Sequence, residues 1–428
     1  MPPHPLLEEL RWRGMLHQHT DGLSDALSRG MVSGYVGFDP SAASLHVGNL
    51  VPVMGLVHLQ RHGHRPVFLA GGGTGLIGDP SGKTTERPLL SVDEIAANTA
   101  SIRAQLERFV DTSGRNGALV RNNADWLVGL KALEFMRDVG KHFTVNYMLQ
   151  KESVKTRLEV GMSYTEFSYM LLQSYDYLQL HLKEGVTLQM GGSDQWGNIT
   201  AGIELIRRTT GAESNALTFP LLTTTSGTKF GKTEAGAVWL DPDRTSPYQF
   251  YQFWINTDDR DIGRMLRTFA LLDRAEIEAL EKAVAERPEG RDAQRALARD
   301  VTRRVHGEDA LSAAEEVSGL LFDKGDPMQL SARALALLER EIPTFDLDGK
   351  ESFDTRDILN AVTSENGALF KSRGEARRAL EQGGVYINGE RVGVERVAVS
   401  HERLLHGRCL LVRRGARNYA LVRVRFNR

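Results

Sequence analysis

Short apolar runs and longer helical patterns alternate along the first half of the chain. Residues Gly34–Phe38, Arg65–Ala70 and Thr187–Met190 are short, mostly apolar runs, a pattern that predicts buried strands. Turn-forming residues follow each of them, in the third case Gly191 and Gly192. Residues Leu45–His62 have the length and spacing of a helix. This alternation predicts an α/β fold built on a Rossmann-like parallel sheet.

The pattern changes twice further along the chain. A helical stretch with many aromatic residues occupies about 125–182, and from about Ser246 to Arg340 the pattern is helical throughout. Pro343 and the Asp/Gly-rich run Asp346–Gly349 are typical of a linker. We therefore predict four parts: a Rossmann-like domain over 1–240 with a helical insertion at about 125–182, an α-helical domain over 241–340, a linker over 341–354, and a small α+β domain over 355–428.

Composition excludes several classes of protein. The chain has 428 residues, of which 41% are hydrophobic and 25% charged, as in globular proteins and unlike disordered or collagen-like chains. We find no run of 18 apolar residues and no basic start followed by an apolar stretch, so neither a membrane span nor a signal peptide is expected. Cys409 is the only cysteine, which excludes an internal disulfide and a thiolate-rich zinc site. We expect a soluble, cytoplasmic protein.

Charge is distributed unevenly along the chain. From Thr355 to Arg428 there are one Lys and fourteen Arg against seven acidic residues, a net charge of +8 that leaves −10 for the other 354 residues. A small basic domain on an acidic body is typical of a nucleic-acid partner. The alternative is that the arginines only keep this end of the chain soluble. We favour the first interpretation because few acidic residues interleave the arginines after His401.

Local signals in the basic domain predict a helix beside a hairpin. Ser372 and Glu375 are spaced as a capping box, at the start of a helix that carries Arg373, Arg377 and Arg378. Residues 385–392 alternate around an Asn-Gly pair, which predicts a two-residue hairpin turn. A basic helix beside a hairpin is suited to binding structured RNA through its shape and phosphates.

Two glycine motifs suggest nucleotide binding but fail on inspection. Residues Gly73–Gly78 match the G-x-G-x-x-G fingerprint of dinucleotide-binding folds, yet the turn sequence Asp79–Gly82 denies the helix that should follow. Lys83 and Thr84 resemble the end of a phosphate-binding loop, but Ile77 stands where its first glycine is required. A nicotinamide-dependent dehydrogenase is therefore disfavoured. The glycines instead predict a tight strand exit next to a ligand.

Three further segments together favour nucleotide chemistry. His46 precedes a helix whose N-terminal amides can hold phosphate. Lys229 and Lys232 flank a glycine on a loop and are suited to meeting the charge of a departing pyrophosphate. Within 165–178, Tyr169, Gln173 and Asp176 share one helix face opposite an apolar stripe. Taken singly, these segments have ordinary explanations: a capped helix, a basic surface loop and a solvated helix face.

At this point the chain resembles a known family, the bacterial tyrosyl-tRNA synthetases among the class I aminoacyl-tRNA synthetases. The resemblance covers essentially the whole length and is carried by five runs: Gly34-Tyr35-Val36-Gly37-Phe38-Asp39-Pro40, His46-Val47-Gly48-Asn49 (the HIGH motif), Gly72-Gly73-Thr74-Gly75-Leu76-Ile77-Gly78-Asp79-Pro80, Gly191-Gly192-Ser193-Asp194-Gln195-Trp196-Gly197-Asn198, and Lys229-Phe230-Gly231-Lys232-Thr233 (the KMSKS motif). The basic domain is similar to a small RNA-binding module shared with a ribosomal small-subunit protein.

The resemblance implies a role for each matching residue. Tyr35 and Asp176 would hold a substrate phenol, and Asp79, Tyr169 and Gln173 its ammonium group. Gln195 would lie near the substrate carboxylate, while Gly192 and Asp194 would meet the ribose. Asp39, His46 and Gly48 would line the ATP side. The leaving pyrophosphate would be surrounded by Lys83, Arg87, Lys229, Lys232 and Thr233, with Lys232 also counted among the ATP-binding residues. Asn49 replaces the second His of the HIGH motif; it can still donate a hydrogen bond but cannot carry charge.

The implied activity is the ATP-dependent ligation of L-tyrosine to tRNA(Tyr) in two steps, through tyrosyl-adenylate with release of pyrophosphate. Mg²⁺ is expected with the ATP, without a metal site built from protein side chains. A homodimer is implied, with its interface near Asp125–Gln150. One alternative is a related adenylyl-forming enzyme such as a tryptophanyl-tRNA synthetase, which the pair Tyr35 and Asp176 disfavours. Another is a non-enzymatic RNA-binding protein on a decayed synthetase, which the intact lysines and aspartates of the motifs disfavour.

Overall fold

The structure is a computed structural model, in which the chain divides into two units. It describes residues 3–81, 90–158, 161–225, 227, 230–233, 236–323, 325–349, 353–363 and 369–426. The first unit comprises Met1–Thr245 and Phe253–Val305, and the second comprises Ser246–Gln252 and His306–Arg428. The four-part division predicted from the sequence is finer than this and stays a prediction.

A six-stranded sheet forms the centre of the first unit, in the order β1-β6-β5-β2-β3-β4. Its strands are β1 (Gln18–His19), β2 (Ser33–Phe38), β3 (Arg65–Ala70), β4 (Leu119–Asn122), β5 (Val186–Gly192) and β6 (Asn215–Phe219). Strands β2 to β6 pair in parallel and β1 runs antiparallel to β6. The predicted parallel α/β sheet and its three predicted strands are confirmed; β1, β4 and β6 were not anticipated.

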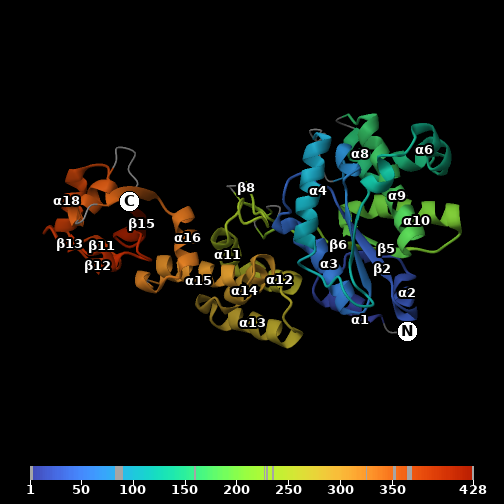
Figure 1. Ribbon diagram of the computed structural model, residues 1–428. Helices are drawn as coiled ribbons and strands as arrows, with labels where there is room; N and C mark the ends of the chain where they lie inside the picture. The colour runs from blue at the N-terminus through green and yellow to red at the C-terminus, as the bar shows by residue number, and fades with distance from the viewer. Residues whose placement is uncertain are drawn as a thin grey trace. The chain divides into compact units, whose positions relative to one another are not determined.

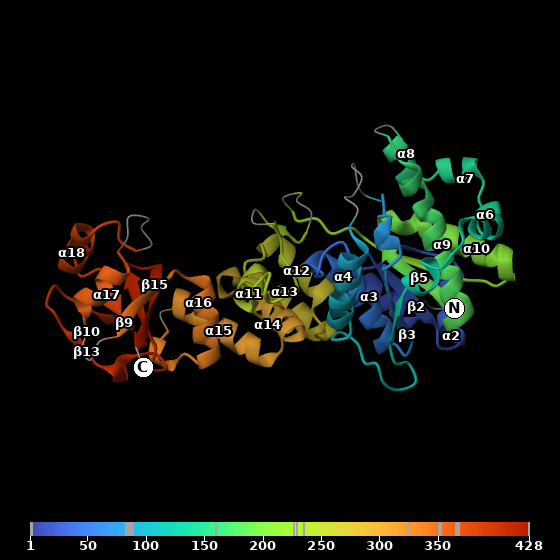
Figure 2. The ribbon, with the colours of Figure 1, turned by 45° about the horizontal axis from the view of Figure 1, so that its top comes forward.

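Helices cover both faces of this sheet (Figures 1 and 2). Helix α3 (Leu50–Arg61) packs on one face, so that a Cβ on Gly34 would come within 2.8 Å of Leu59. Helices α9 (Tyr164–Glu184) and α10 (Trp196–Thr210) cover the other face, where the rings of Tyr35 and Tyr177 lie 5.3 Å apart. Successive β2 residues thus face opposite layers, and the carboxyl ends of β2, β3 and β5 share one edge, where parallel α/β sheets bind ligands.

The remaining elements of the first unit are mostly helical, as the sequence pattern predicts. Before β5 they are α1 (Pro5–Trp12), α2 (Leu23–Arg29), η1 (Val47–Asn49), η2 (Thr74–Leu76), α4 (Val92–Leu106), α5 (Ala124–Leu127), α6 (Ala132–Asp138), η3 (Gly140–His142), α7 (Val145–Leu149) and α8 (Glu152–Leu158). After β5 they are η4 (Ser193–Gln195), the short strands β7 (Lys232–Thr233) and β8 (Gly236–Ala237), α12 (Asp259–Phe269), α13 (Arg274–Glu286), η5 (Pro288–Gly290) and α14 (Asp292–His306). Helix α11 (Pro247–Ile255) is shared between the two units.

The second unit joins two helices to a five-stranded sheet in the order β12-β11-β14-β15-β9. Its elements are α15 (Glu308–Phe322), η6 (Pro327–Gln329), α16 (Ala332–Glu341), β9 (Thr344–Gly349), β10 (Phe353–Asp354), α17 (Thr355–Ala361), α18 (Arg373–Glu381), β11 (Val385–Ile387), β12 (Glu390–Arg391), β13 (Ala398–Val399), η7 (His401–Arg403), β14 (Cys409–Arg414) and β15 (Asn418–Phe426). Buried side chains of β11, β14, β15 and α17 form its core.

The segment predicted to be a linker contributes a strand to this sheet. Strand β9 pairs in parallel with β15, in a register that sets Asp346 opposite Arg423 and Asp348 opposite Arg425. Asp346 also forms an ion pair of 2.6 Å with Arg425. Aspartates favour turns in an isolated sequence, but here arginines of the neighbouring strand compensate their charge.

The helix and the hairpin predicted for the basic domain are confirmed, with one difference in the cap. The Ser372 side chain caps α18 by accepting a hydrogen bond from the Glu375 amide, but the Glu375 side chain, which a capping box would direct to the Ser372 amide, accepts from the Lys371 amide over 2.7 Å. Strands β11 and β12 form the expected hairpin, with φ of 47° at Asn388 and 84° at Gly389. Positive φ at both turn residues is what the type I′ turn of a two-residue hairpin requires.

Among the helices of the described residues, none is long and apolar enough to cross a membrane.

Candidate active site

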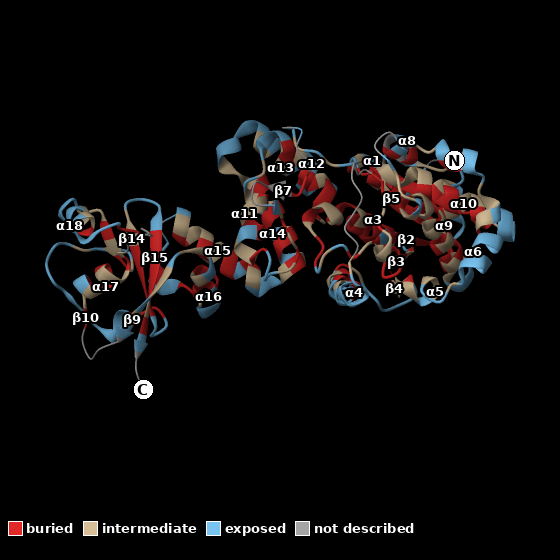
Figure 3. Ribbon diagram, turned by 90° about the horizontal axis from the view of Figure 1, so that it is seen from above, coloured by how far each residue is buried: buried red, intermediate tan, exposed pale blue. Residues whose placement is uncertain are grey.

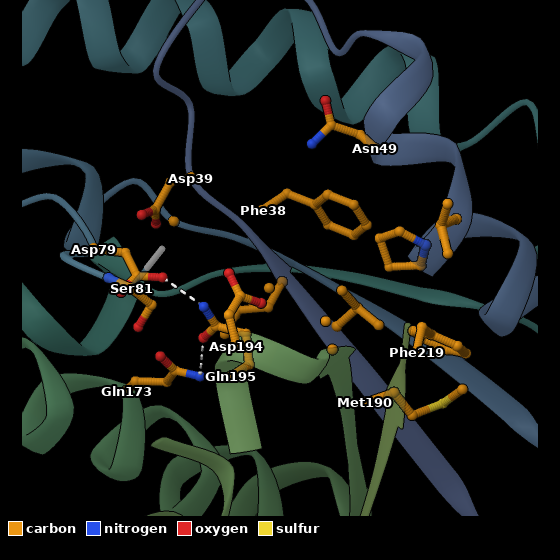
Figure 4. Close-up of a pocket in the computed structure, with 18 of the residues that line it drawn as sticks. Phe38, Asp39, Asn49, Asp79, Ser81, Gln173, Met190, Asp194, Gln195 and Phe219 are labelled. Atoms are coloured by element: carbon orange, nitrogen blue, oxygen red, sulfur yellow. Dashed lines mark hydrogen bonds between the residues drawn. The ribbon is translucent and has the colours of Figure 1, made fainter. Parts of the chain in front are cut away.

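A pocket of about 620 Å³ opens at the carboxyl edge of β2 and β5, bounded by α9 and by the turn before α3 (Figure 4). It brings together twelve residues predicted from the sequence: Tyr35, Asp39, His46, Gly48, Asn49, Asp79, Tyr169, Gln173, Asp176, Gly192, Asp194 and Gln195. Lys83, Arg87 and Lys229 lie outside the described residues. Lys232 and Thr233 form β7, but their side chains are not among the described parts of the chain.

A buried carboxylate marks one end of the pocket. Asp176, on α9, is 2% exposed and accepts hydrogen bonds from Asn123 Nδ2 (2.9 Å) and Trp126 Nε1 (2.8 Å). Burial raises the pKa of Asp176 to about 7, against the two hydrogen bonds, which lower it. Each carboxylate oxygen has two lone pairs, so both can accept a further donor. This end of the pocket is built to receive a hydrogen-bond donor.

The hydroxyl of Tyr35 lacks a hydrogen-bond partner among the described residues. Tyr35 is 1% exposed, and burial, then the charge of Asp176, raises its pKa well above the ordinary value. A buried hydroxyl without a partner costs free energy, since it has lost its hydrogen bonds to water. Tyr35 and Asp176 both line the pocket, so a ligand hydroxyl can donate to Asp176 and accept from Tyr35.

A chain of side-chain amides fixes a second carboxylate (Figure 4). Gln195 Nε2 donates to Asp79 Oδ2 over 2.7 Å, and Gln173 Nε2 donates to Gln195 Oε1 over 3.2 Å. Asn198 Nδ2 donates to Gln173 Oε1 over 2.9 Å and so closes the chain behind the pocket. The bonds orient Gln195 and Gln173 with few remaining degrees of freedom. Asp79 thereby faces the pocket from a fixed position.

A third carboxylate, Asp39, lies at the end of β2. It accepts hydrogen bonds from Thr74 Oγ1 (2.8 Å) and from the Tyr169 hydroxyl (3.1 Å). Burial and then the charge of Asp39 raise the pKa of Asp79 to about 6. Neither Lys nor Arg occurs among the described lining residues. Since, besides burial, the charge of Asp39 raises the pKa of both Asp79 and Asp176, a cationic group such as a ligand ammonium stabilises their ionised forms.

The HIGH-motif segment forms a capped turn at the start of α3. His46 Nδ1 accepts from the Gly48 amide over 3.0 Å, and Asn49 Oδ1 accepts from the His46 amide over 3.0 Å, so Asn49 retains a structural hydrogen bond. A Cβ on Gly48 would come within 2.8 Å of the His46 ring, so any residue other than glycine would clash with the ring in this position. The ring of Trp239 meets the His46 ring edge-on at 6.1 Å, with the Arg244 guanidinium 3.9 Å above Trp239.

The sequence did not point to Asn123 and Trp126, which hold Asp176. Both follow β4, a short strand whose residues are all half-buried and include Arg121 and Asn122, so that its pattern is weak. The Asn-Asn pair after the apolar run Ala118–Val120 was the one available signal. Gln189 was also missed: it lines the pocket, is 3% exposed, and its Oε1 lacks a partner among the described residues.

Within the described residues, no group of three or more His, Cys, Asp or Glu is arranged to hold a metal ion.

Two family models match the chain. The model described as class I tRNA synthetases (W and Y) matches residues 28–323, and the model described as the tyrosine–tRNA ligase SYY-like C-terminal domain matches residues 335–422. The glycine run agrees with neither nucleotide fingerprint: as far as Ser81 it forms only the short turn η2.

Curated relatives match over nearly the whole chain. The tyrosine–tRNA ligase of Roseiflexus castenholzii is 54% identical over 427 residues, covering 98% of this chain and 99% of the relative. That of Bacillus caldotenax is 50% identical over 422 residues, with the same coverage. Among solved structures, a C-terminally truncated mitochondrial tyrosyl-tRNA synthetase of Aspergillus nidulans has a TM-score of 0.67 and 31% identity, covering 75% of this chain and 95% of that one.

Proposed function

The chain belongs to the class I tRNA synthetases of the tryptophan and tyrosine type, and we propose that its pocket activates L-tyrosine for transfer to tRNA(Tyr). The reaction is the ATP-dependent ligation of tyrosine to tRNA in two steps, through tyrosyl-adenylate with release of pyrophosphate. This assignment rests on the matched family model and on curated relatives that share about half of the residues over nearly the full length.

One observation favours tyrosine over other amino acids: the buried pair Asp176 and Tyr35. Asp176 is fixed by two donors and retains free lone pairs, and the Tyr35 hydroxyl lacks a partner among the described residues. A phenol hydroxyl donates to the first and accepts from the second. Phenylalanine and tryptophan carry no hydroxyl there, so either would leave both buried groups without their ligand bonds.

The rest of the pocket supports a role in binding the amino-acid backbone. We assign the substrate ammonium to Asp79, Gln173 and Tyr169, because all three line the pocket and the neighbouring carboxylates Asp79 and Asp39 favour a cation. Gln195 and its amide hydrogens lie next to Asp79, where the substrate carboxylate would follow.

The first step needs positioning more than proton transfer. The substrate carboxylate attacks the α-phosphorus of ATP, and the bond from that phosphorus to the pyrophosphate oxygen breaks. A carboxylate is already ionised at neutral pH and requires no general base, so the contribution of the chain is alignment and stabilisation of phosphate charge. We assign the latter to His46, Asn49 and the lysines of the KMSKS motif, and the ribose to Gly192 and Asp194.

ATP enters as its Mg²⁺ complex in this proposal. Mg²⁺ keeps several waters and is usually bound through substrate phosphates, with at most one or two protein carboxylates. The ion is thus part of the substrate. It supplies neutralisation of phosphate charge.

For the tRNA, we propose the basic C-terminal domain as one contact. Arg373, Arg377 and Arg378 lie exposed on α18 beside the β11–β12 hairpin. Guanidinium groups on one helix can follow an RNA backbone through its phosphates. We further propose that the protein acts in the cytoplasm, where its tRNA substrate is used.

We also propose a homodimer that forms through the segment near 125–150. Five large apolar side chains of this segment are exposed, namely Val128, Leu133, Met136, Val145 and Leu149. Helix α6, which carries two of them, is drawn almost wholly exposed in Figure 3. Clustered apolar exposure marks an interaction surface. Leu133→Asp together with Met136→Asp is expected to convert a dimer to a monomer in sedimentation velocity; an unaltered sedimentation coefficient would refute this interface.

The experiment that tests the proposed activity is ATP–pyrophosphate exchange with each of the twenty amino acids offered separately. Tyrosine alone is expected to support rapid exchange. Exchange driven by tryptophan would favour the related synthetase instead. If the protein is folded but none of the twenty amino acids supports exchange, a non-enzymatic RNA-binding role would be favoured.

A further inference from the structure

Helix α12 holds the polypeptide that leads into the KMSKS motif. The Asp261 carboxylate, in the first turn of α12, accepts hydrogen bonds from Thr225 three times over: the Thr225 amide donates to Oδ1 (3.2 Å) and Oδ2 (3.0 Å), and the Thr225 hydroxyl donates to Oδ1 (2.7 Å). One turn along, Arg264 donates to the Thr223 carbonyl and to Asp261 (3.0 Å). Two residues of one helix thus bind two positions of the loop, Thr223 and Thr225.

Burial makes this contact strong. Asp261 is 5% exposed, and burial alone would raise its pKa, but the hydrogen bonds from Thr225 and the charge of Arg264 outweigh that effect and hold the pKa below its ordinary value. A buried carboxylate is retained only where donors compensate its lost hydration. All the donors to Asp261 that the structure records come from Thr225 and Arg264.

The other end of the same loop packs against the far end of α12. Phe230 is 8% exposed, and its ring stacks on Phe269, the last residue of α12, at 5.2 Å. Phe253 and Trp254 enclose the same ring at 5.6 and 5.8 Å. Helix α12 therefore holds both ends of the segment that contains Lys229 and precedes Lys232.

The loop end at Phe230 also adjoins the HIGH-motif turn. Gly231 has φ of +84°, and a Cβ there would come within 2.9 Å of Val47 and 3.1 Å of the Gly48 amide. The Gly231 carbonyl accepts a hydrogen bond from the Val238 amide. The Val238 carbonyl in turn accepts one from the Val47 amide. The two ATP motifs thus share one backbone scaffold at this point.

Helix α12 is itself held firmly at its C-terminal end. The buried Arg13 donates to the carbonyls of Arg267, Ala270 and Leu272 over 2.9, 2.8 and 3.1 Å. Arg304 donates to the Phe269 carbonyl over 3.0 Å. Two guanidinium groups, one from the C-cap of α1 and one from α14, therefore satisfy carbonyls at the end of α12 and just beyond it, where cations are also favoured by the helix dipole. A helix held in this way can serve as a fixed reference for the loop.

We propose that Asp261 is a positioning residue for adenylate formation: by binding Thr225 it fixes the start of the loop that presents the KMSKS lysines to the phosphates. This proposal rests on the proposed activity. Without the contact between Asp261 and Thr225, a longer part of the loop is free to move. Holding its lysines against the phosphates in the transition state then costs more conformational entropy. The effect should fall on the chemical step and leave the tyrosine pocket unchanged, since Asp261 touches no pocket residue in its recorded bonds.

The test compares Asp261→Ala with Asp258→Ala in the full-length protein. Asp258 is the N-cap of α12, and the hydrogen bonds given for its side chain all join it to Arg260, so loss of this side chain weakens the same helix without touching the loop. At saturating ATP and tyrosine, Asp261→Ala is expected to form adenylate about 10- to 100-fold more slowly, as loss of charge-assisted bonds predicts. Its equilibrium affinity for tyrosine should stay within about twofold, and Asp258→Ala should change neither.

A second readout does not depend on activity. Limited trypsin digestion should cleave the Asp261→Ala protein after Lys229 or Lys232 sooner than it cleaves the parent or Asp258→Ala. Thr225→Val removes only the hydroxyl bond and should give an intermediate result in both assays. It also serves if Asp261→Ala fails to fold.

The outcomes separate the two levels of the argument. Equal slowing by Asp261→Ala and Asp258→Ala would show a general loss of helix stability. No slowing by either variant would show that the contact with Thr225 does not position the loop for the reaction. Either result would overturn the positioning role and leave the synthetase assignment intact. Absence of tyrosine-dependent exchange in the parent would refute the proposed activity itself, and the trypsin comparison would still decide whether Asp261 holds the loop.

Discussion

Replacing Tyr35 by Phe should separate ligand binding from folding. The Tyr35 hydroxyl is buried and lacks a partner among the described residues, so its removal breaks no recorded protein hydrogen bond. An unsatisfied buried polar group costs about 1–3 kcal/mol. The free energy of unfolding of ligand-free Tyr35→Phe is therefore expected to equal that of the parent or exceed it by up to about that amount.

Tyrosine binding should change in the opposite direction. A hydrogen bond between neutral groups contributes about 0.5–1.5 kcal/mol net, so tyrosine should bind about 2- to 13-fold more weakly to Tyr35→Phe, with kcat/KM for exchange lowered to match. Phenylalanine, which lacks the hydroxyl, should be bound no worse than by the parent. The variant would thus be as stable as the parent but less selective.

Tyr177→Phe is the matched control, because the two rings are in contact at 5.3 Å and both are buried. The Tyr177 hydroxyl donates to the Asn215 carbonyl over 2.8 Å and accepts from the Asn215 amide over 3.3 Å. Its loss should lower the free energy of unfolding by about 1–3 kcal/mol with little effect on selectivity. Urea unfolding of ligand-free protein and exchange kinetics measure the two effects. If Tyr35→Phe destabilised the protein and left selectivity unchanged, the assignment of Tyr35 to the ligand would be wrong.

Three further predictions concern the charged groups. Burial and the charge of Asp39 raise the pKa of Asp79 to about 6, and the substrate ammonium favours the ionised form of Asp79. Tyrosine affinity should therefore fall as pH falls below about 6, by roughly tenfold per pH unit. Equilibrium dialysis of the parent would show this fall in affinity, and Asp79→Asn should lack it. Lys232→Ala should slow adenylate formation by about 10²–10³ in single-turnover experiments while tyrosine affinity stays constant, and unaltered rates would remove this lysine from the chemistry. Joint replacement of Arg373, Arg377 and Arg378 by Gln should weaken tRNA binding and reduce its salt dependence by about one log–log slope unit per lost phosphate contact, without affecting exchange.

The central sheet could be predicted from the sequence where short apolar runs are followed by turn residues. Strands β2 and β3 are buried along most of their length and show up as mostly apolar runs, while β5, in which Thr187 and Gln189 alternate with apolar residues, is marked by the glycines that follow it. Strand β9 could not be predicted in this way, because Asp346 and Asp348 favour turns until the arginines of β15 lie beside them. That compensation joins residues about 80 positions apart and leaves no local signal.

The candidate site divides in the same way. Tyr169, Gln173 and Asp176 could be grouped from helical spacing alone, and the pocket contains all three. Asn123 and Trp126 could not, because their bonds to Asp176 span 53 and 50 residues and depend on how β4 ends beside α9. The bond from Tyr169 to Asp39 spans 130 residues and was likewise hidden.

The proposed function is tested most directly by aminoacylation of unmodified tRNA(Tyr) transcript by the purified full-length chain, with ATP and one amino acid at a time. Tyrosine alone should be esterified to the transcript, with one AMP released per tyrosyl-tRNA, and Asp176→Ala should lose this activity. Charging with tryptophan in place of tyrosine, or no charging by a folded protein with tyrosine and ATP, would contradict the proposed function.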